Sequence, residues 1–122
     1  MTTILIIEDD VDLAELILER LKDEGYDTSV VYSGKEAIRK VIEQKPDCIT
    51  LDVHLPDMSG IEILREIKGS IDKNLPVIVV TSDDAMRNEC EKYNPEGFFK
   101  KPIDFKQLKK LIKVTIDKKQ KK

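Results

Sequence analysis

Five short aliphatic runs recur along the chain, and they constrain its fold more than any other feature. They lie at residues 4–7, 30–31, 48–51, 77–80 and 98–99. None shows the apolar–polar alternation of a half-exposed strand, and all are far too short to span a bilayer. Such runs are typical of parallel strands that helices cover on both faces.

Between these runs lie sequences with helical periodicity. The first apolar stripe is followed by Gly25, which we expect to end its helix in the left-handed conformation. Three later helices open with pairs spaced like capping boxes. The region 84–93 is the weakest helix prediction, and Asn94-Pro95 ends it. The stripe residues are Leu13, Leu16, Ile17 and Leu21, and the capping pairs are Ser33 with Glu36, Ser59 with Glu62, and Asp104 with Gln107.

Strict alternation of five strands with five helices predicts right-handed crossovers and one α/β domain with a single doubly wound parallel sheet. We take the flavodoxin-like order 2-1-3-4-5 for the five strands. In such sheets, ligands bind beyond the carboxyl ends of the strands, so the residues at those ends are the candidates for function.

Complementary chemistry gathers at these ends. The first strand ends in Glu8-Asp9-Asp10 and the third in Asp52, while Thr81 closes the fourth and Lys101 follows the fifth. If the order is 2-1-3-4-5, Glu8, Asp9 and Asp52 converge and repel one another. A hard divalent cation such as Mg²⁺ would resolve that repulsion, because it prefers oxygen ligands. A carboxylate nucleophile, a metal, a hydroxyl and a cation together suit phosphoryl transfer.

Taken singly, most of these residues have ordinary structural explanations. Acidic residues before a helix often only compensate its dipole, which is our interpretation of Asp10 and Asp12. A strand-end threonine is usually a turn residue, and a lysine before proline is usually exposed. The functional hypothesis depends on four separate elements delivering these groups to the same edge.

Four motifs in order resemble the receiver domains of two-component response regulators. They are ILIIEDD from Ile4, LDVHLPDMSG from Leu51, PVIVVTS from Pro76 and GFFKKP from Gly97. The likeness covers essentially the whole chain. It implies that Asp52 is the phosphoacceptor, and that it takes the phosphoryl group from a phosphohistidine of a sensor kinase or phosphotransfer protein.

The resemblance also implies individual roles. Asp9 would bind Mg²⁺ directly, Glu8 would act through a metal-bound water, and the backbone carbonyl of His54 would complete the protein ligands. Thr81 would move to bond a phosphoryl oxygen, and Lys101 would pair with another.

The switch residues follow from the same resemblance. Phe98 stands where the family has an aromatic residue that turns inward on activation, so Thr81 and Phe98 form the expected switch. Gly60 matches a glycine that opens the third helix. His54 and Asp83 each lie two residues after a site residue, so we expect them to flank the path of an attacking water and set the phosphoryl lifetime.

Two departures from the family pattern lie close together. From Thr81 to Lys101 the chain is about two residues shorter, judged by the motif positions, with Asn94-Pro95-Glu96 where Gly-Ala turns are usual. Lys100 stands where an apolar residue is common. Both departures fall near the fourth helix and fifth strand, the region the family uses most for output.

Charge is distributed unevenly. From Lys100 onward ten lysines face two aspartates, a balance of +8, so residues 1–99 carry −11 of the total of −3. This acidic body is not typical of a domain that binds nucleic acid directly. We expect residues 1–117 to form the receiver domain and 118–122 to be a disordered tail. The strip Lys106, Lys109, Lys110 and Lys113 is a hypothetical contact for an acidic output partner on the face of the fourth helix, fifth strand and fifth helix.

Other patterns limit the remaining alternatives for location and protein class. Cys48 and Cys90 have neither zinc nor disulfide spacing, and no signal segment opens the chain, so we expect a cytoplasmic location and no membrane span. A haloacid dehalogenase phosphatase would carry a second aspartate where this chain has His54. A receiver relic would have lost one of the site residues. We therefore expect a phosphoacceptor switch rather than an enzyme with turnover, acting as a monomer or weak dimer, either alone or as part of a larger regulator.

Overall fold

The computed structural model describes residues 2–120 and forms one parallel sheet in the order β2-β1-β3-β4-β5. The fold class and the strand order predicted from the sequence are confirmed. The strands are β1 (Thr3–Ile7), β2 (Asp27–Val31), β3 (Cys48–Leu51), β4 (Val77–Thr81) and β5 (Gly97–Lys100).

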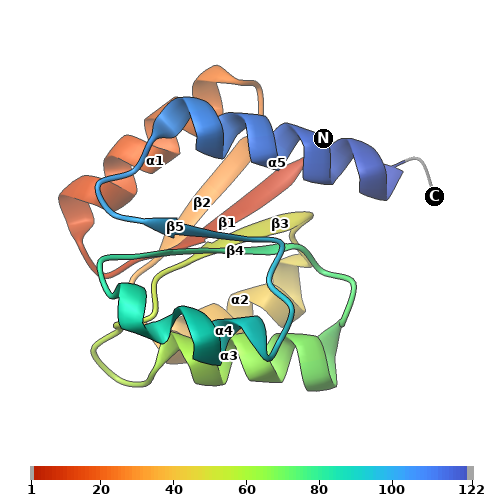
Figure 1. Cartoon of the computed structure of the whole chain (residues 1–122). Helices are drawn as coiled ribbons and strands as arrows, with labels where there is room; N and C mark the ends of the chain where they lie inside the picture. The colour runs from red at the N-terminus through yellow and green to blue at the C-terminus, as the bar shows by residue number, and fades with distance from the viewer. Residues whose placement is uncertain (1, 121–122) are drawn as a thin grey trace.

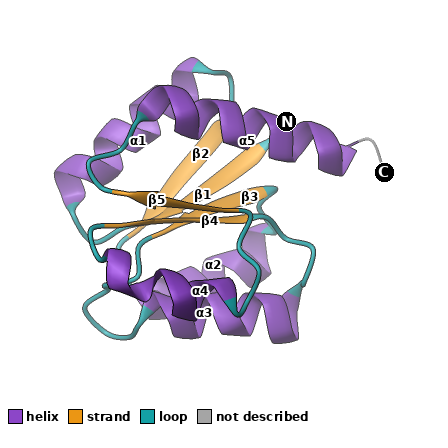
Figure 2. Ribbon diagram, viewed as in Figure 1, coloured by secondary structure: helices purple, strands orange, loops and turns teal. Residues whose placement is uncertain are grey.

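Helices cover both faces of this sheet (Figures 1 and 2). On one face lie α1 (Val11–Asp23) and α5 (Phe105–Gln120). On the other lie α2 (Gly34–Gln44), α3 (Gly60–Glu66) with its π-helical continuation η1 (Ile67–Ile71), and a 3₁₀ turn, η2 (Asp84–Met86), that leads into α4 (Arg87–Glu91).

The two helical layers enclose two separate cores. Leu5 and Ile7 of β1 pack with α2 and α3, whereas Ile4 and Ile6 pack with α1 and α5. Successive side chains of a strand point to opposite faces, so both sets of positions must be apolar. This is the physical reason that the strand sequences show no alternation.

Local signals place most of the helix ends. The Asp10 side chain caps α1 by accepting from the Leu13 amide at 3.2 Å, and Gly25 takes a φ of 92° just beyond that helix. Ser33 and Asp104 accept from the amides of Glu36 and Gln107, as their spacing predicted. Ser59 instead accepts from the amide of Ile61 at 3.1 Å, one residue earlier than a capping box requires.

Two segments differ from expectation. The weak fourth helix is a 3₁₀ turn followed by five α-helical residues, and Asn94 beyond it has a φ of 54°. The last helix continues to Gln120 rather than ending at Asp117, so residues 118–120 are helical and not a disordered tail. Residues 121–122 lie outside the described part of the chain. Among the described residues, no helix is both long and apolar enough to cross a membrane.

Candidate functional site

Three carboxylates meet at the carboxyl edge of the sheet. Parallel pairing sets Ile7 beside Leu51, so the residues that follow β1 and β3 emerge next to each other. Glu8, Asp9 and Asp52 bring ligand oxygens within 4.8 Å of one another. Glu8 and Asp52 are buried and Asp9 is exposed. The predicted acidic cluster therefore forms.

Lys101 reaches this cluster from the end of β5. Its Nζ lies 2.8 Å from Glu8 Oε1 and 3.1 Å from Asp52 Oδ2. The Lys101 backbone amide donates to the Thr81 carbonyl at 2.9 Å, which fixes the start of its side chain against β4. The contact between Lys101 and Glu8 is a feature that sequence reasoning missed, since the family pattern pointed to the phosphoryl group as the lysine's partner.

Burial and charge change the protonation of this pair. Burial, followed by the neighbouring Asp52, raises the pKa of Glu8 to about 7, although the hydrogen bond from Lys101 acts to lower it. Burial alone would lower the pKa of Lys101, but its hydrogen bond to Glu8 and the charges of Glu8 and Asp52 outweigh this and raise it. Lys101 therefore remains a cation, and the site holds carboxylates that are hard to ionise together.

The donor set suits a hard divalent cation. Lys101 neutralises one buried carboxylate at most, and Asp9 makes no hydrogen bond or ion pair with any described residue. Three oxygen ligands on one small volume, one of them open to solvent, match the preference of Mg²⁺ for carboxylates and retained water. The residues present thus fit the predicted metal.

The loop after β3 holds Asp52 in place. The amide of His54 donates to Asp52 Oδ1 at 3.2 Å. At the start of α3, a Cβ on Gly60 would overlap the Asp52 carbonyl oxygen and lie 2.7 Å from the Val53 Cα, so this close approach requires glycine. Asp57 accepts from the amides of Gly34 and Lys35, at 2.7 and 3.0 Å, and so ties the loop to the start of α2.

The remaining predicted residues lie on the β4 side of the site. Thr81 is fully buried, and its hydroxyl accepts from the Asp83 amide at 3.2 Å. His54 Nε2 and Asp83 Oδ2 lie 2.9 Å apart. The two residues expected to flank the site therefore contact each other, a bridge that neither position revealed in the sequence.

Phe98 lies away from the carboxylates, on the face of β5 that α4 covers. Its ring packs against the α2–α3–α4 core, and the Arg87 guanidinium carbon lies 4.7 Å from the ring centroid. Sequence reasoning missed Arg87, because a cation on a short exposed helix gives no signal of its partner.

The fold is that of a doubly wound α/β protein. At the carboxyl edge of its sheet, where such proteins bind ligands, lie three carboxylates that suit a divalent cation, together with Lys101. The sequence model of the response regulator receiver domain family matches residues 4–113. The chain belongs to this family, whose general function is to accept a phosphoryl group on an aspartate from a sensor kinase.

Relatives agree with this assignment. The chain is 34% identical over 118 residues to the response regulator ArlR of Staphylococcus saprophyticus, covering 95% of this chain and 53% of that protein. It is 38% identical over 79 residues to the DNA-binding response regulator MtrA of Mycobacterium tuberculosis, covering 65% of this chain and 34% of MtrA. The chain thus spans from a third to about half of these relatives' lengths.

Solved structures give the same result. The response regulator TrrA of Thermotoga maritima, solved in complex with Mg²⁺ and BeF, matches with a TM-score of 0.87 and 29% identity, covering 94% of this chain and 99% of that one. A receiver domain of a sensor histidine kinase from Pseudomonas aeruginosa, with magnesium in its active-site cleft, matches with a TM-score of 0.86 and 26% identity over 95% of this chain and 98% of that one. The match to the receiver family rules out the alternative of a haloacid dehalogenase phosphatase.

Proposed function

We propose that Asp52 is the phosphoacceptor of this receiver domain. A carboxylate oxygen of Asp52 would attack the phosphorus of a phosphohistidine whose ring carries a proton on its other nitrogen. The phosphorus–nitrogen bond would break, and the imidazole would leave as the neutral ring. The observation that carries the proposal is the meeting of Asp52 with Glu8, Asp9 and the Lys101 ammonium at one strand edge. Asp10 caps α1, and Asp57 accepts from two amides at the start of α2, so those two carboxylates have structural roles.

Glu8, Asp9 and Asp52 would hold Mg²⁺, with Asp9 in direct contact, Glu8 acting through water and the His54 carbonyl completing the protein ligands. The bound ion would supply positive charge against the phosphoryl oxygens. The exposure of Asp9 and the engagement of Glu8 by Lys101 support this division of roles.

Lys101 and Thr81 would bind the peripheral oxygens of the phosphoryl group. Lys101 already lies 3.1 Å from Asp52, whereas the Thr81 hydroxyl accepts from the Asp83 amide and would have to reorient. That movement would open space for Phe98 and change the surface of α4, β5 and α5. A small charge change would then bias a two-state surface.

We place the domain in phosphorelay signalling in the cytoplasm, with a histidine kinase or phosphotransfer protein as donor. The output partner would bind the α4–β5–α5 surface, and the domain itself would contact no nucleic acid. Its only reactions would be its own phosphorylation and slow autodephosphorylation, in a monomer or weak dimer. We propose residues 1–117 as the receiver domain, with α5 itself continuing to Gln120.

The test is phosphorylation by acetyl phosphate with Mg²⁺, read by intact mass. The wild type should gain one phosphoryl group, and Asp52→Asn should gain none. Asp23→Asn, a matched change at an exposed position late in α1, should label like the wild type. Full labelling of Asp52→Asn would refute the assignment.

A further inference from the structure

The amino edge of the sheet, opposite the carboxylates, is hollowed in two adjoining places. An α3–α4 cleft of about 270 Å³ lies between the end of α3 and the chain that leaves α4. An α5 groove of about 680 Å³ lies between the connection into β4 and the last turns of α5. Lys73 lines both hollows, so they adjoin at this residue.

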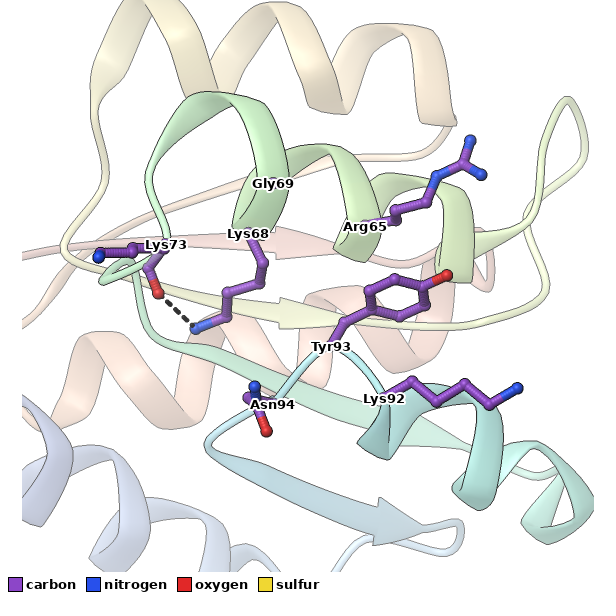
Figure 3. Close-up of a pocket in the computed structure, with 7 residues that line it drawn as sticks. All are labelled: Arg65, Lys68, Gly69, Lys73, Lys92, Tyr93 and Asn94. Carbon is purple, nitrogen blue, oxygen red and sulfur yellow. Dashed lines mark hydrogen bonds between the residues drawn. The ribbon is translucent and has the colours of Figure 1, made fainter.

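The α3–α4 cleft has a positive rim. Figure 3 shows Lys73 at the left of the cleft and Arg65 and Lys92 at the right, with the amino groups of Lys73 and Lys92 pointing to opposite sides. Arg65 and Lys73 form no ion pair with any described residue, and Lys92 has only an exposed contact with Glu89 at 2.9 Å. Exposed pairs of that kind contribute little, so the rim is available to an anionic partner.

Hydrogen bonds hold the residues at the back of the cleft in place. The Lys68 side chain is only 8% exposed, and its Nζ donates to the Leu75 carbonyl at 2.8 Å and to Glu96 Oε1 at 2.8 Å. Glu96 also accepts from the Val77 amide at 2.8 Å. Glu96 also lines the α5 groove, and the Lys68 ammonium offsets its negative charge, so this pair adds no net charge to either hollow.

Two backbone features shape the same cleft. Residues 67–71 form a π-helical turn, a rare conformation that occurs often at functional sites. Gly69 lies in this turn, and a Cβ built there meets nothing within 4 Å, so the backbone is open to an incoming group. Across the cleft, Asn94 takes a left-handed φ of 54° in the short segment that departs from the family pattern.

The α5 groove continues the positive path over an apolar surface. Lys118 and Lys119 follow Lys73 along it, and Pro76, Leu111 and Val114 supply the apolar lining. Val114 is 45% exposed, which is high for a large aliphatic side chain.

We propose that this amino edge binds an extended acidic segment of a partner protein, whose aliphatic side chains enter the α5 groove. A single compact anion would need cations that converge on one point, whereas these cations are spread along a path. The carboxylates of an extended acidic segment would meet these cations, and its apolar side chains would meet Pro76, Leu111 and Val114. The surface lies away from Asp52 and does not depend on phosphoryl chemistry.

The experiment uses the full chain and a fluorescein-labelled peptide of repeated Glu-Asp-Leu triplets. Fluorescence anisotropy should show saturable binding that weakens with salt, because the rim charges are exposed. Amide NMR should show shifts at Gly69, Asn94 and Val114. Asp52→Asn should bind the peptide like the wild type, which separates this proposal from that of the phosphoacceptor.

Two variants and one matched control decide the outcome. Lys73→Glu should weaken binding by about tenfold, whereas Lys22→Glu, the same charge change at an exposed position late in α1, should have a much smaller effect. Gly69→Gln should block the cleft without lowering the melting temperature, since its side chain enters open space. Equal losses in the two lysine variants would refute a specific site. Tighter binding of oligo-dT or phosphatidylglycerol vesicles through Lys73 would overturn the choice of a protein partner.

Discussion

At the carboxyl edge of the sheet, Glu8, Asp9 and Asp52 bring their oxygens within 4.8 Å, and Lys101 enters among them. At the amino edge, exposed cations line the α3–α4 cleft and the α5 groove without meeting at one point. The first arrangement has an electrostatic conflict, since burial and Asp52 raise the pKa of Glu8 to about 7. The second arrangement has no such conflict, because solvent screens the exposed cations from one another. Convergence under burial suits chemistry, and exposed spacing suits recognition.

A pair of glycines gives the largest contrast between the edges. Gly60→Ala should destabilise the fold by about 3 kcal/mol, because the new methyl group would overlap the Asp52 backbone. Gly69→Ala should be neutral or stabilise it by about 0.5–1 kcal/mol, because it meets no atom and alanine favours helix. Urea denaturation of both variants measures the difference. Equal effects would mean that the carboxyl edge is no more tightly packed than the amino edge.

The metal ligands give the next largest effect. Asp9→Asn should weaken Mg²⁺ binding by about tenfold or more, and more than Glu8→Gln, because Glu8 already pairs with Lys101. Mg²⁺ titration followed by amide NMR gives both affinities. Arg65→Gln, at the amino edge, serves as the control and should leave the affinity unchanged. A larger loss in Glu8→Gln would show that the two roles are reversed.

Most of the fold followed from the sequence because each of its signals is local. Runs of aliphatic residues report burial on both faces, and Asp10, Ser33 and Asp104 report helix starts, so strands, helices and their order could be inferred. The acidic cluster followed too, since parallel strands bring their carboxyl ends to one edge.

The sequence did not reveal pairings between side chains from distant segments. Lys101 with Glu8, His54 with Asp83 and Arg87 with Phe98 depend on rotamers and on the height of each loop above the sheet. The extra helical residues after Asp117 were missed for a related reason. Lysines are good helix formers, and a charged composition alone does not separate a frayed end from a helix.

The bridge between His54 and Asp83 should produce a smaller, kinetic effect. The two side chains lie 2.9 Å apart, on residues whose backbone amides bond to Asp52 and Thr81. Removing either partner should open the path of water, so His54→Ala and Asp83→Ala should each speed autodephosphorylation by about two- to tenfold. Because both act through one bridge, the double variant should match the faster single one. Unchanged decay in both single variants would end this idea.

The smallest effect concerns the link between the site and the α4–β5–α5 surface. Arg87 lies over the Phe98 ring at 4.7 Å, a cation–π contact worth about 0.5–1 kcal/mol because Arg87 is half exposed. If inward rotation of Phe98 breaks this contact, Arg87→Ala should favour the rotated state by that amount. Such a bias changes the ratio of two states by about two- to fivefold.

Beryllofluoride, a phosphoryl mimic, provides the measurement. In the wild type, amide NMR should show shifts at Thr81, at Phe98 and along α5. In Arg87→Ala, the Phe98 signals should already lie partway toward their bound positions before the mimic is added. Arg20→Ala removes the equivalent stack on Phe105, at 4.8 Å on the other face of the sheet, and should leave Phe98 where it is in the wild type. Shifts confined to the loops around Asp9 and Asp52 would place the output on another face, and unchanged Phe98 signals in Arg87→Ala would show that Arg87 does not restrain the ring.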